Sequence, residues 1–358
     1  MKGSILLPAF AAIATLFSCT RTEVSVQENI PIAFSTYVAN SVASKAGDTF
    51  KAQGDEFRAG DKIGLFSYYQ KKASFNDISV PNFMFNQSLA FNGYSWRYSP
   101  LKYWPGDYGE EGDIDRLSFF SYYPYASLAS SDTTGIRFLS KDGGTYKETS
   151  KGLPVISFTQ KDKVNSQIDL MFNDFRDGTE RNITGATYGG SVNLVFGHAL
   201  ALVSFEMREV EGMDMVIKSM SLSGVKGNGT CDLDASSETI TINWTATGNS
   251  RTYTIPSLED ARLLMIPQSI TDDIILRVEY DLTFEGADKG EDGTGTGTMI
   301  TYADNRCEVS LTKMVDKDGN TVPSSITSWH AGRKYVYRIN PGLERIEFGE
   351  IVEDSWTE

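Results

Sequence analysis

Two histidines, His198 and His330, limit the catalytic chemistry that this sequence supports. A zinc site would need Asp, Glu or Cys ligands in addition, and the sequence has no HExxH or CxxC spacing. No serine or cysteine stands beside a base in a nucleophile motif. We therefore predict that the chain is not an enzyme and that it binds no cofactor or metal ion.

Two acidic segments offer oxygen atoms to a cation. Residues 288–297 read DKGEDGTGTG and residues 316–320 read DKDGN. Neither has the full EF-hand calcium pattern with its terminal glutamate, so we interpret both as turns. The formal net charge of -14 also argues against nucleic acid, because a phosphate backbone requires clustered Lys and Arg.

The first residues of the chain indicate secretion. Residues 5–17 form an apolar run that is too short to span a bilayer, and LFSC at residues 16–19 ends it on a small residue before a cysteine. This pattern resembles the signal peptide of a bacterial lipoprotein. We predict cleavage after residues 1–18 and lipidation of Cys19, which would anchor the mature chain to a membrane. The alternative is an ordinary secretory signal with an incidental cysteine.

Cys231 and Cys307 are the two cysteines that remain after the leader. In an oxidising envelope they can form a disulfide only if the fold brings them close together. The sequence does not show that they are close, so their pairing stays open.

Most of the remaining chain consists of short runs of alternating polarity that are separated by Gly, Asn, Asp or Pro. This pattern is typical of antiparallel β-sandwiches. His198 belongs to such a run at residues 192–202, where it shares a face with aliphatic and aromatic residues. We expect it to form a hydrogen bond in or beside the core and not to bind metal. His330 lies in a turn that leads into a strand.

Residues 116–127, RLSFFSYYPYAS, carry an unusual density of aromatic rings. Such rings form either a platform for sugars or a strand that is buried on both faces. Because burial of each large ring contributes about 1.5–3 kcal/mol, we favour the core. Trp96 and Trp104 lie upstream and remain candidates for stacking on glycans. The clustered rings are those of Phe119, Phe120, Tyr122, Tyr123 and Tyr125.

The length predicts two domains behind the leader. Apolar residues become sparse and Gly, Thr and Asn accumulate at residues 176–190, which is the best boundary. We predict an all-β protein with two tandem antiparallel β-sandwich domains, at residues 19–185 and 186–358.

Behind the lipoprotein leader, the chain carries these segments in order: IPIAFSTYV (30–38), FRAGDKIGLFSYY (57–69), YSWRYSPLKYWP (94–105), QIDLMF (167–172), VNLVFGHALALVSFEM (192–207) and WHAGRKYVYRI (329–339). This order of segments resembles the fimbrillin (Mfa-like) family of Bacteroidales across about residues 30–356. This resemblance implies two transthyretin-like sandwiches and a structural or tip subunit of a type V pilus. It also implies adhesion, and a location at the cell outer membrane and in the extracellular fimbrium. The alternative is a surface lipoprotein that binds carbohydrate or host protein without polymerising.

The resemblance also implies proteolytic removal of the first strand. Family members are cut after a basic residue that follows this strand, and Lys45 stands at the matching place, with Arg58 as the alternative. The displaced strand would carry the apolar side chains of Ile30, Ile32, Phe34 and Val38.

Removal of that strand would leave a groove that another pilus subunit fills by strand exchange. Residues 345–356 are a candidate donor, because they are extended in pattern and alternate in polarity. The alternative is that this segment is the last strand of its own domain. On the donor hypothesis, one face carries Ile346, Phe348, Val352 and Trp356.

Overall fold

The computed structural model describes eleven stretches of the chain. Cys19, Ile30, Lys45 and the predicted boundary at residues 176–190 lie outside these stretches. The described stretches are 31–38, 57–70, 75–104, 116–173, 191–208, 210–235, 240–258, 261–285, 299–316, 318–340 and 346–356.

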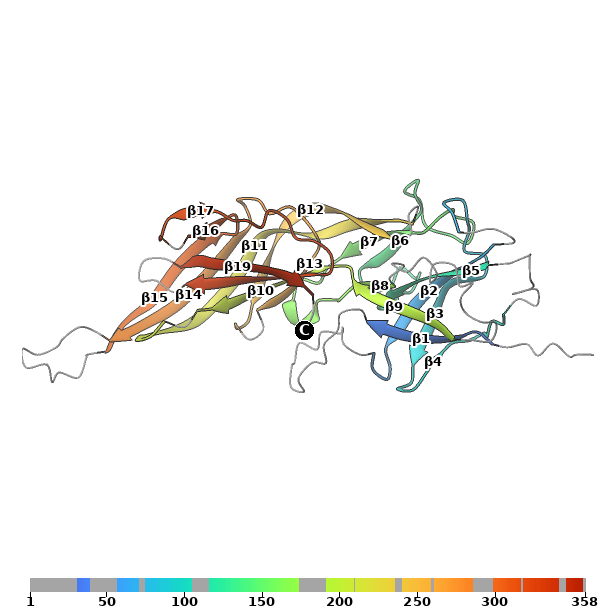
Figure 1. Ribbon diagram of the computed structural model, residues 1–358, viewed down its shortest axis with the longest axis horizontal. Coiled ribbons are helices and arrows are strands. Elements are labelled where there is room, and N and C mark those ends of the chain that lie inside the picture. The colour runs from blue at the N-terminus through green and yellow to red at the C-terminus, as the bar shows by residue number, and fades with distance from the viewer. Residues whose placement is uncertain are drawn as a thin grey trace, which may run out of the picture.

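The described residues form an elongated, almost entirely β-stranded molecule (Figure 1), which confirms the all-β prediction. A short 3₁₀ helix at Val164–Ser166 is the only helical element within these stretches. No helix of the described part is long and apolar enough to cross a membrane.

A seven-stranded sheet dominates the first half of the chain. Its strand order is β1-β9-β8-β5-β2-β3-β4. β8 and β9 pair although they lie on either side of the predicted domain boundary. The strands are β1 (Ala33–Val38), β2 (Lys62–Gln70), β3 (Met84–Phe91), β4 (Trp96–Arg97), β5 (Arg116–Tyr123), β8 (Met171–Asn173) and β9 (Ser191–His198).

Two further sheets face one another, and most of their strands come from the second half of the chain. The four-stranded sheet has the order β13-β10-β18-β19, and the six-stranded sheet has β15-β14-β11-β7-β6 with β12 also paired to β11. A small hairpin joins β16 and β17. These strands are β6 (Ile136–Leu139), β7 (Val155–Thr159), β10 (Ala201–Met207), β11 (Met213–Asp234), β12 (Thr241–Ile255), β13 (Arg262–Met265), β14 (Ile275–Glu285), β15 (Met299–Ser310), β16 (Lys313–Val315), β17 (Thr321–Pro323), β18 (Arg333–Asn340) and β19 (Glu347–Ser355).

Three apolar clusters fill the space around these sheets. The N-terminal core lies on one face of the seven-stranded sheet and includes Phe34, Leu65 and Phe119. The central core lies on its other face and includes Phe66, Phe120 and Ile156. The C-terminal core, which includes Phe205, Leu222 and Phe348, lies between the four- and six-stranded sheets.

The aromatic strand β5 is buried on both faces, as predicted. Phe119 and Tyr123 belong to the N-terminal core, whereas Phe120 and Tyr122 belong to the central core. This division follows from the two-residue period of a strand. Trp96 and Trp104 are 7% and 3% exposed, so neither presents a ring face to a glycan.

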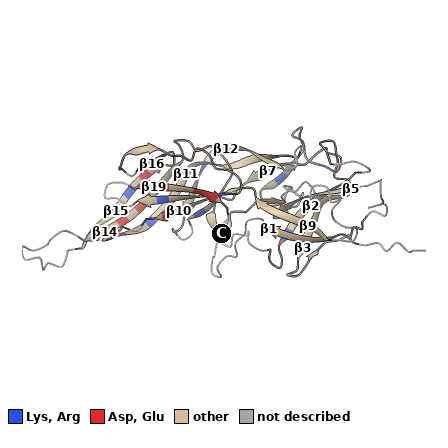
Figure 2. Cartoon of the chain, in the orientation of Figure 1, with Lys and Arg blue, Asp and Glu red and all other residues tan. Residues whose placement is uncertain are grey.

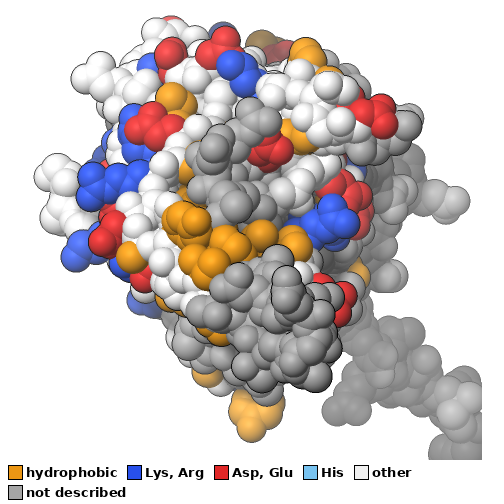
Figure 3. All heavy atoms as spheres, turned by 90° about the vertical axis from the view of Figure 1, so that its left-hand side faces the viewer, with side chains coloured by type: hydrophobic (Ala, Val, Ile, Leu, Met, Phe, Trp, Pro, Cys, Tyr) orange, Lys and Arg blue, Asp and Glu red, His pale blue; other side chains and the backbone are white. Residues whose placement is uncertain are grey.

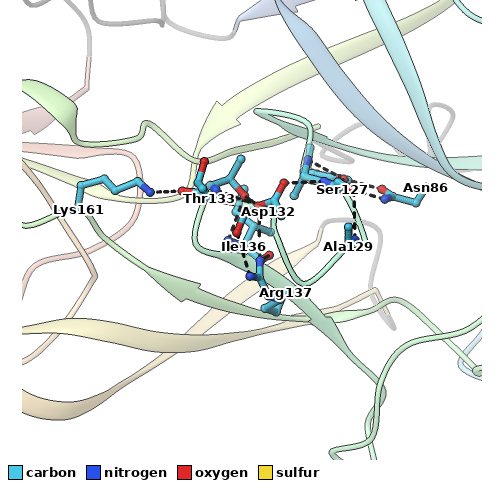
Figure 4. A network of polar contacts seen from close by, with 11 residues as sticks. Asn86, Ser127, Ala129, Asp132, Thr133, Ile136, Arg137 and Lys161 are labelled. Carbon is cyan, nitrogen blue, oxygen red and sulfur yellow. Dashed lines mark hydrogen bonds and ion pairs between the residues drawn. The ribbon is translucent and has the colours of Figure 1, made fainter.

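The connection from β5 to β6 passes from the seven-stranded sheet to the six-stranded sheet and is held by a polar network (Figure 4). The carboxylate of Asp132 accepts the backbone N–H of Ser127 at 2.8 Å and that of Thr134 at 2.9 Å. Arg137 donates to the Asp132 carbonyl at 3.0 Å, and Lys161 donates to the carbonyl of Thr133. These contacts fix the path of the chain between the two sheets.

Phe120 offers a direct test of burial in β5. Its ring lies 6.2 Å from Phe66 and 5.8 Å from Phe172, measured between centroids. We expect Phe120→Ala to lower the free energy of unfolding by about 3–5 kcal/mol in urea denaturation followed by circular dichroism. Tyr94→Ala is the control, because that ring is 95% exposed and its loss should change stability by less than about 0.5 kcal/mol. Equal losses in both variants would contradict the buried position of β5.

Candidate functional site

β1 is the strand that closes the seven-stranded sheet. It pairs in parallel with β9, from Ala33 opposite Ser191 to Val38 opposite Phe196, whereas the other strand pairs of this sheet are antiparallel. Parallel neighbours cannot be joined by a tight turn. β1 is therefore added to this sheet from a distant part of the sequence.

The opposite edge of β1 contacts the segment around β4, so the sheet curls until its two ends meet. The Ile32 N–H donates to the carbonyl of Lys102 at 2.9 Å, and the indole N–H of Trp96 donates to Oγ1 of Thr36 at 3.0 Å. The hydroxyl of Tyr98 donates to the carbonyl of Ile32 at 2.8 Å. β1 is thus held along both edges.

The inward side chains of β1 are part of the N-terminal core. Ile32, Phe34 and Val38 are 1%, 6% and 3% exposed, and the ring of Phe34 lies 5.6 Å from both Tyr98 and Phe119. Ile30, the fourth residue predicted for this strand, lies outside the described residues. Since each buried side chain contributes about 1.5–3 kcal/mol, β1 stabilises the fold by an amount that is large beside a typical net stability.

Arg58, the alternative processing residue, lies in a tight turn just ahead of β2. Its backbone N–H donates to the Asp61 carboxylate at 2.6 Å. The preceding residue, Phe57, packs edge-on against Trp96, Tyr123 and Phe196, with centroids 5.1–5.5 Å apart. The side chain of Arg58 is exposed, but a protease would have to disrupt these contacts to extend the backbone around it.

Residues Glu347–Ser355 of the predicted donor segment form β19, which pairs in antiparallel fashion with β18 of the same chain. The pairing shifts register between Arg338 and Ile339, which leaves Gly349 as an extra residue in β19. Such a β-bulge reverses the face on which the following residues point. In this docked position the four predicted residues therefore do not share one face: Phe348 lies in the C-terminal core, whereas Trp356 lies in the central core.

Trp356 connects the end of β19 to the seven-stranded sheet. Its indole stacks on the imidazole of His198 with centroids 3.7 Å apart and planes 9° apart. Nδ1 of His198 lies 3.1 Å and 3.0 Å from the two carboxylate oxygens of Asp169. We call Trp356, His198 and Asp169 the C-terminal clasp.

The C-terminal clasp is almost completely shielded from water. The side chains of His198 and Asp169 are 6% and 2% exposed. This confirms the prediction that His198 forms a hydrogen bond within the core. Sequence reasoning missed Asp169 as its partner, although Asp169 stands within an apolar segment that leads into β8, and a charge in such a place signals a buried pair.

The remaining candidate residues that the structure describes form no further site. Cys231 is buried, Cys307 is half-buried, and both are free thiols. His330 is exposed, and the carboxylate of Asp316 accepts backbone N–H groups within the predicted turn at residues 316–320. The predicted turn at residues 288–297 lies outside the described residues. Within the described stretches, no group of three or more His, Cys, Asp or Glu is arranged to hold a metal ion.

Charged pairs cover the outer side of the six-stranded sheet, where Figure 2 shows Lys or Arg alternating with Asp or Glu on β14 and β15. Lys218 lies 2.7 Å from both Asp281 and Asp304, and Arg277 lies 2.6 Å from Glu308. β15 is an edge strand, and charged side chains on such a strand discourage pairing with another chain.

Apolar side chains are exposed near the far end of this sheet. Val216, Met299 and Tyr302 are 56%, 61% and 47% exposed. Hydrophobic side chains gather on the face that looks along the long axis at this end of the molecule (Figure 3). Exposed patches of this kind mark contact surfaces in many proteins.

The C-terminal clasp predicts a specific effect of Trp356. Trp356→Ala removes a buried ring from the central core and should destabilise the fold by about 3–5 kcal/mol. Amide hydrogen exchange should accelerate at the end of β19, where the backbone N–H of Trp356 donates to the carbonyl of Gly332 at 3.0 Å. Trp356→Phe, which retains an aromatic face, is the matched control. Unchanged exchange at residues 353–356 in the alanine variant would show that the stacking does not hold this strand.

Comparisons with known proteins agree with the fold. A family model described as fimbrillin-like matches residues 51–356. The fimbrium subunit Fim1C of Phocaeicola vulgatus is 26% identical over 209 residues, which cover 57% of this chain and 50% of that relative. This chain therefore matches about half the length of the relative. The crystal structure of a fimbrial protein from Bacteroides vulgatus has a TM-score of 0.55 at 19% identity, covering 92% of this chain and 100% of the other, so the two share a fold. Because the family model spans most of the sequence, this chain belongs to the fimbrillin-like family.

Proposed function

We propose that this chain is a subunit of a surface fimbrium, a type V pilus, and that subunits join by strand exchange. In this proposal β1 is removed from its sheet, and the C-terminal segment of a second copy takes its place. The resulting polymer is an extracellular appendage that mediates adhesion.

The position of β1 is the observation that supports exchange best. It is one short strand between two edges, with three buried side chains and hydrogen bonds on both sides. Its removal would expose apolar surface together with unpaired N–H and C=O groups of β9 and of residues around Lys102. An extended chain that alternates in polarity fits such a groove.

An N-terminal lipid on Cys19 would first carry the subunit to the outer membrane. Proteolysis after Lys45 would then separate β1 from β2 and release the subunit from its anchor. Arg58 is the weaker candidate, because its turn and the packing of Phe57 resist extension in a protease.

Processing can be tested by N-terminal sequencing of protein that is released from the cell surface. Cleavage after Lys45 predicts a mature chain that begins at Ala46, and Lys45→Gln should abolish this start. A start at Ala59 would instead identify Arg58. A chain that still begins at a lipidated Cys19 in the assembled material would contradict processing.

A second candidate function follows from the docked position of β19. Both β1 and β19 are paired within their own chain, which is the arrangement expected of a surface lipoprotein that binds carbohydrate or host protein without polymerising. The two functions differ in whether β1 must leave its sheet.

A disulfide that locks β1 separates these functions. Ser35 and Asn193 are exposed partners across the β1–β9 pair, with Oγ and Oδ1 3.4 Å apart, and neighbouring strands have a spacing that a disulfide can span. We expect the Ser35→Cys, Asn193→Cys chain, with Cys307→Ser as background, to yield folded monomers when oxidised and filaments when reduced. Electron microscopy of cells labelled against the chain provides the measurement.

The single Ser35→Cys variant is the control and should assemble under both conditions. Because the lock is reversible, a folding defect is recognised by its persistence after reduction. Filaments built from fully oxidised, locked chains would refute strand exchange. Absence of filaments even from the reduced chain and from the control, with the label confined to the membrane, would favour the lipoprotein.

A further inference from the structure

Two heptapeptides at opposite ends of the chain share one pattern. Residues 32–38 read IAFSTYV, and residues 346–352 read IEFGEIV. Ile, Phe and Val occupy the first, third and seventh positions of both. The fifth position is Thr36 in the first heptapeptide and Glu350 in the second, and both carry a side-chain oxygen.

Each of these four positions has a defined environment in β1. The first, third and seventh side chains are buried in the N-terminal core. The fifth, Thr36, is only half-buried, and its Oγ1 accepts the indole N–H of Trp96. Trp96 itself is 7% exposed, so its N–H has little access to water if the strand beside it offers no acceptor.

The same four positions do not share a face where β19 now lies. The bulge at Gly349 separates Phe348 from Val352, and Glu350 is exposed and pairs with Arg338. A strand without the bulge would point Ile346, Phe348, Glu350 and Val352 to one side. Gly349 would then take the outward position of Ser35.

We propose that residues 346–352 of one copy replace residues 32–38 of the next copy residue for residue, parallel to β9, and that Trp96 fixes this register by donating to Glu350. This inference rests on the strand exchange proposed above and names the part of the donor that the groove recognises. Trp96 is a specificity-determining residue in this scheme.

The chemistry of the fifth position favours this register over its neighbours. At a half-exposed site, a carboxylate can accept the indole N–H with one oxygen and keep the other in water, and a charged acceptor strengthens the bond. A shift by two residues would bury the Glu350 carboxylate at the place of Phe34 or Val38, which is costly without a partner. A shift by one residue would turn the apolar side chains outward.

Cross-linking between copies tests the register. With residue 349 in the place of Ser35, it faces Asn193 of the next copy. In filaments of Cys307→Ser background, we expect an intermolecular disulfide between Gly349→Cys and Asn193→Cys, and at least tenfold less between Glu347→Cys and Asn193→Cys. Preferential cross-linking of residue 347, or filaments without the 349–193 disulfide, would overturn the register. The locked β1 chain reports on exchange itself, so the two failures are distinguishable.

The role of Trp96 is tested by the rate at which purified filaments dissociate in guanidinium. We expect Glu350→Val to accelerate dissociation about tenfold, since it removes the acceptor, and Glu350→Gln to change it less than about threefold. In a Trp96→Phe background, which has no indole N–H, Glu350→Val should not accelerate dissociation further through this contact. The pair of Glu350 with Arg338 belongs to the docked strand, so in the filament it adds the same amount, or nothing, in both backgrounds and cancels in this cycle. Equal acceleration by Glu350→Val with and without Trp96 would exclude the assigned role.

Discussion

The pairing of β1 with two different edges is the constraint on which the N-terminal half depends. A seven-stranded sheet twists and curls, and here β4 and the residues that follow it contact β1 through Trp96, Tyr98 and Lys102. β1 therefore completes the enclosure of the N-terminal core. The stability of this core depends on the position of β1. β1 does not pair with β2, which is the next strand in the sequence.

The second half of the chain depends in a comparable way on one strand, β11. Its first residues pair with β14 beside the C-terminal core, and residues 228–231 pair with β7 beside the central core. The C-terminal clasp adds a contact between β19 and the end of β9. The C-terminal and central cores are therefore joined through β11, which contributes buried side chains to both.

The local sequence pattern predicted the strands well, but it did not predict which strands pair with one another. The alternation in β5 identified a strand buried on both faces, because the period of a strand assigns Phe119 and Phe120 to opposite sides. The apolar face around His198 likewise indicated a histidine bonded within the core. The pairing of β1 with β9 arises from long-range closure of the sheet, which leaves no local signature. The bulge at Gly349 inverted the faces of β19, and a period count cannot detect one extra residue.

The direction of β1 has a mechanical consequence. Figure 1 shows this strand lying roughly along the long axis of the molecule, and its hydrogen bonds to β9 run across that axis. Tension applied along a strand in this orientation loads all of its lateral bonds in shear at the same time, whereas tension across it would open them one after another. Any strand in this position, whether it comes from the same chain or from another, is therefore oriented to bear a pulling load.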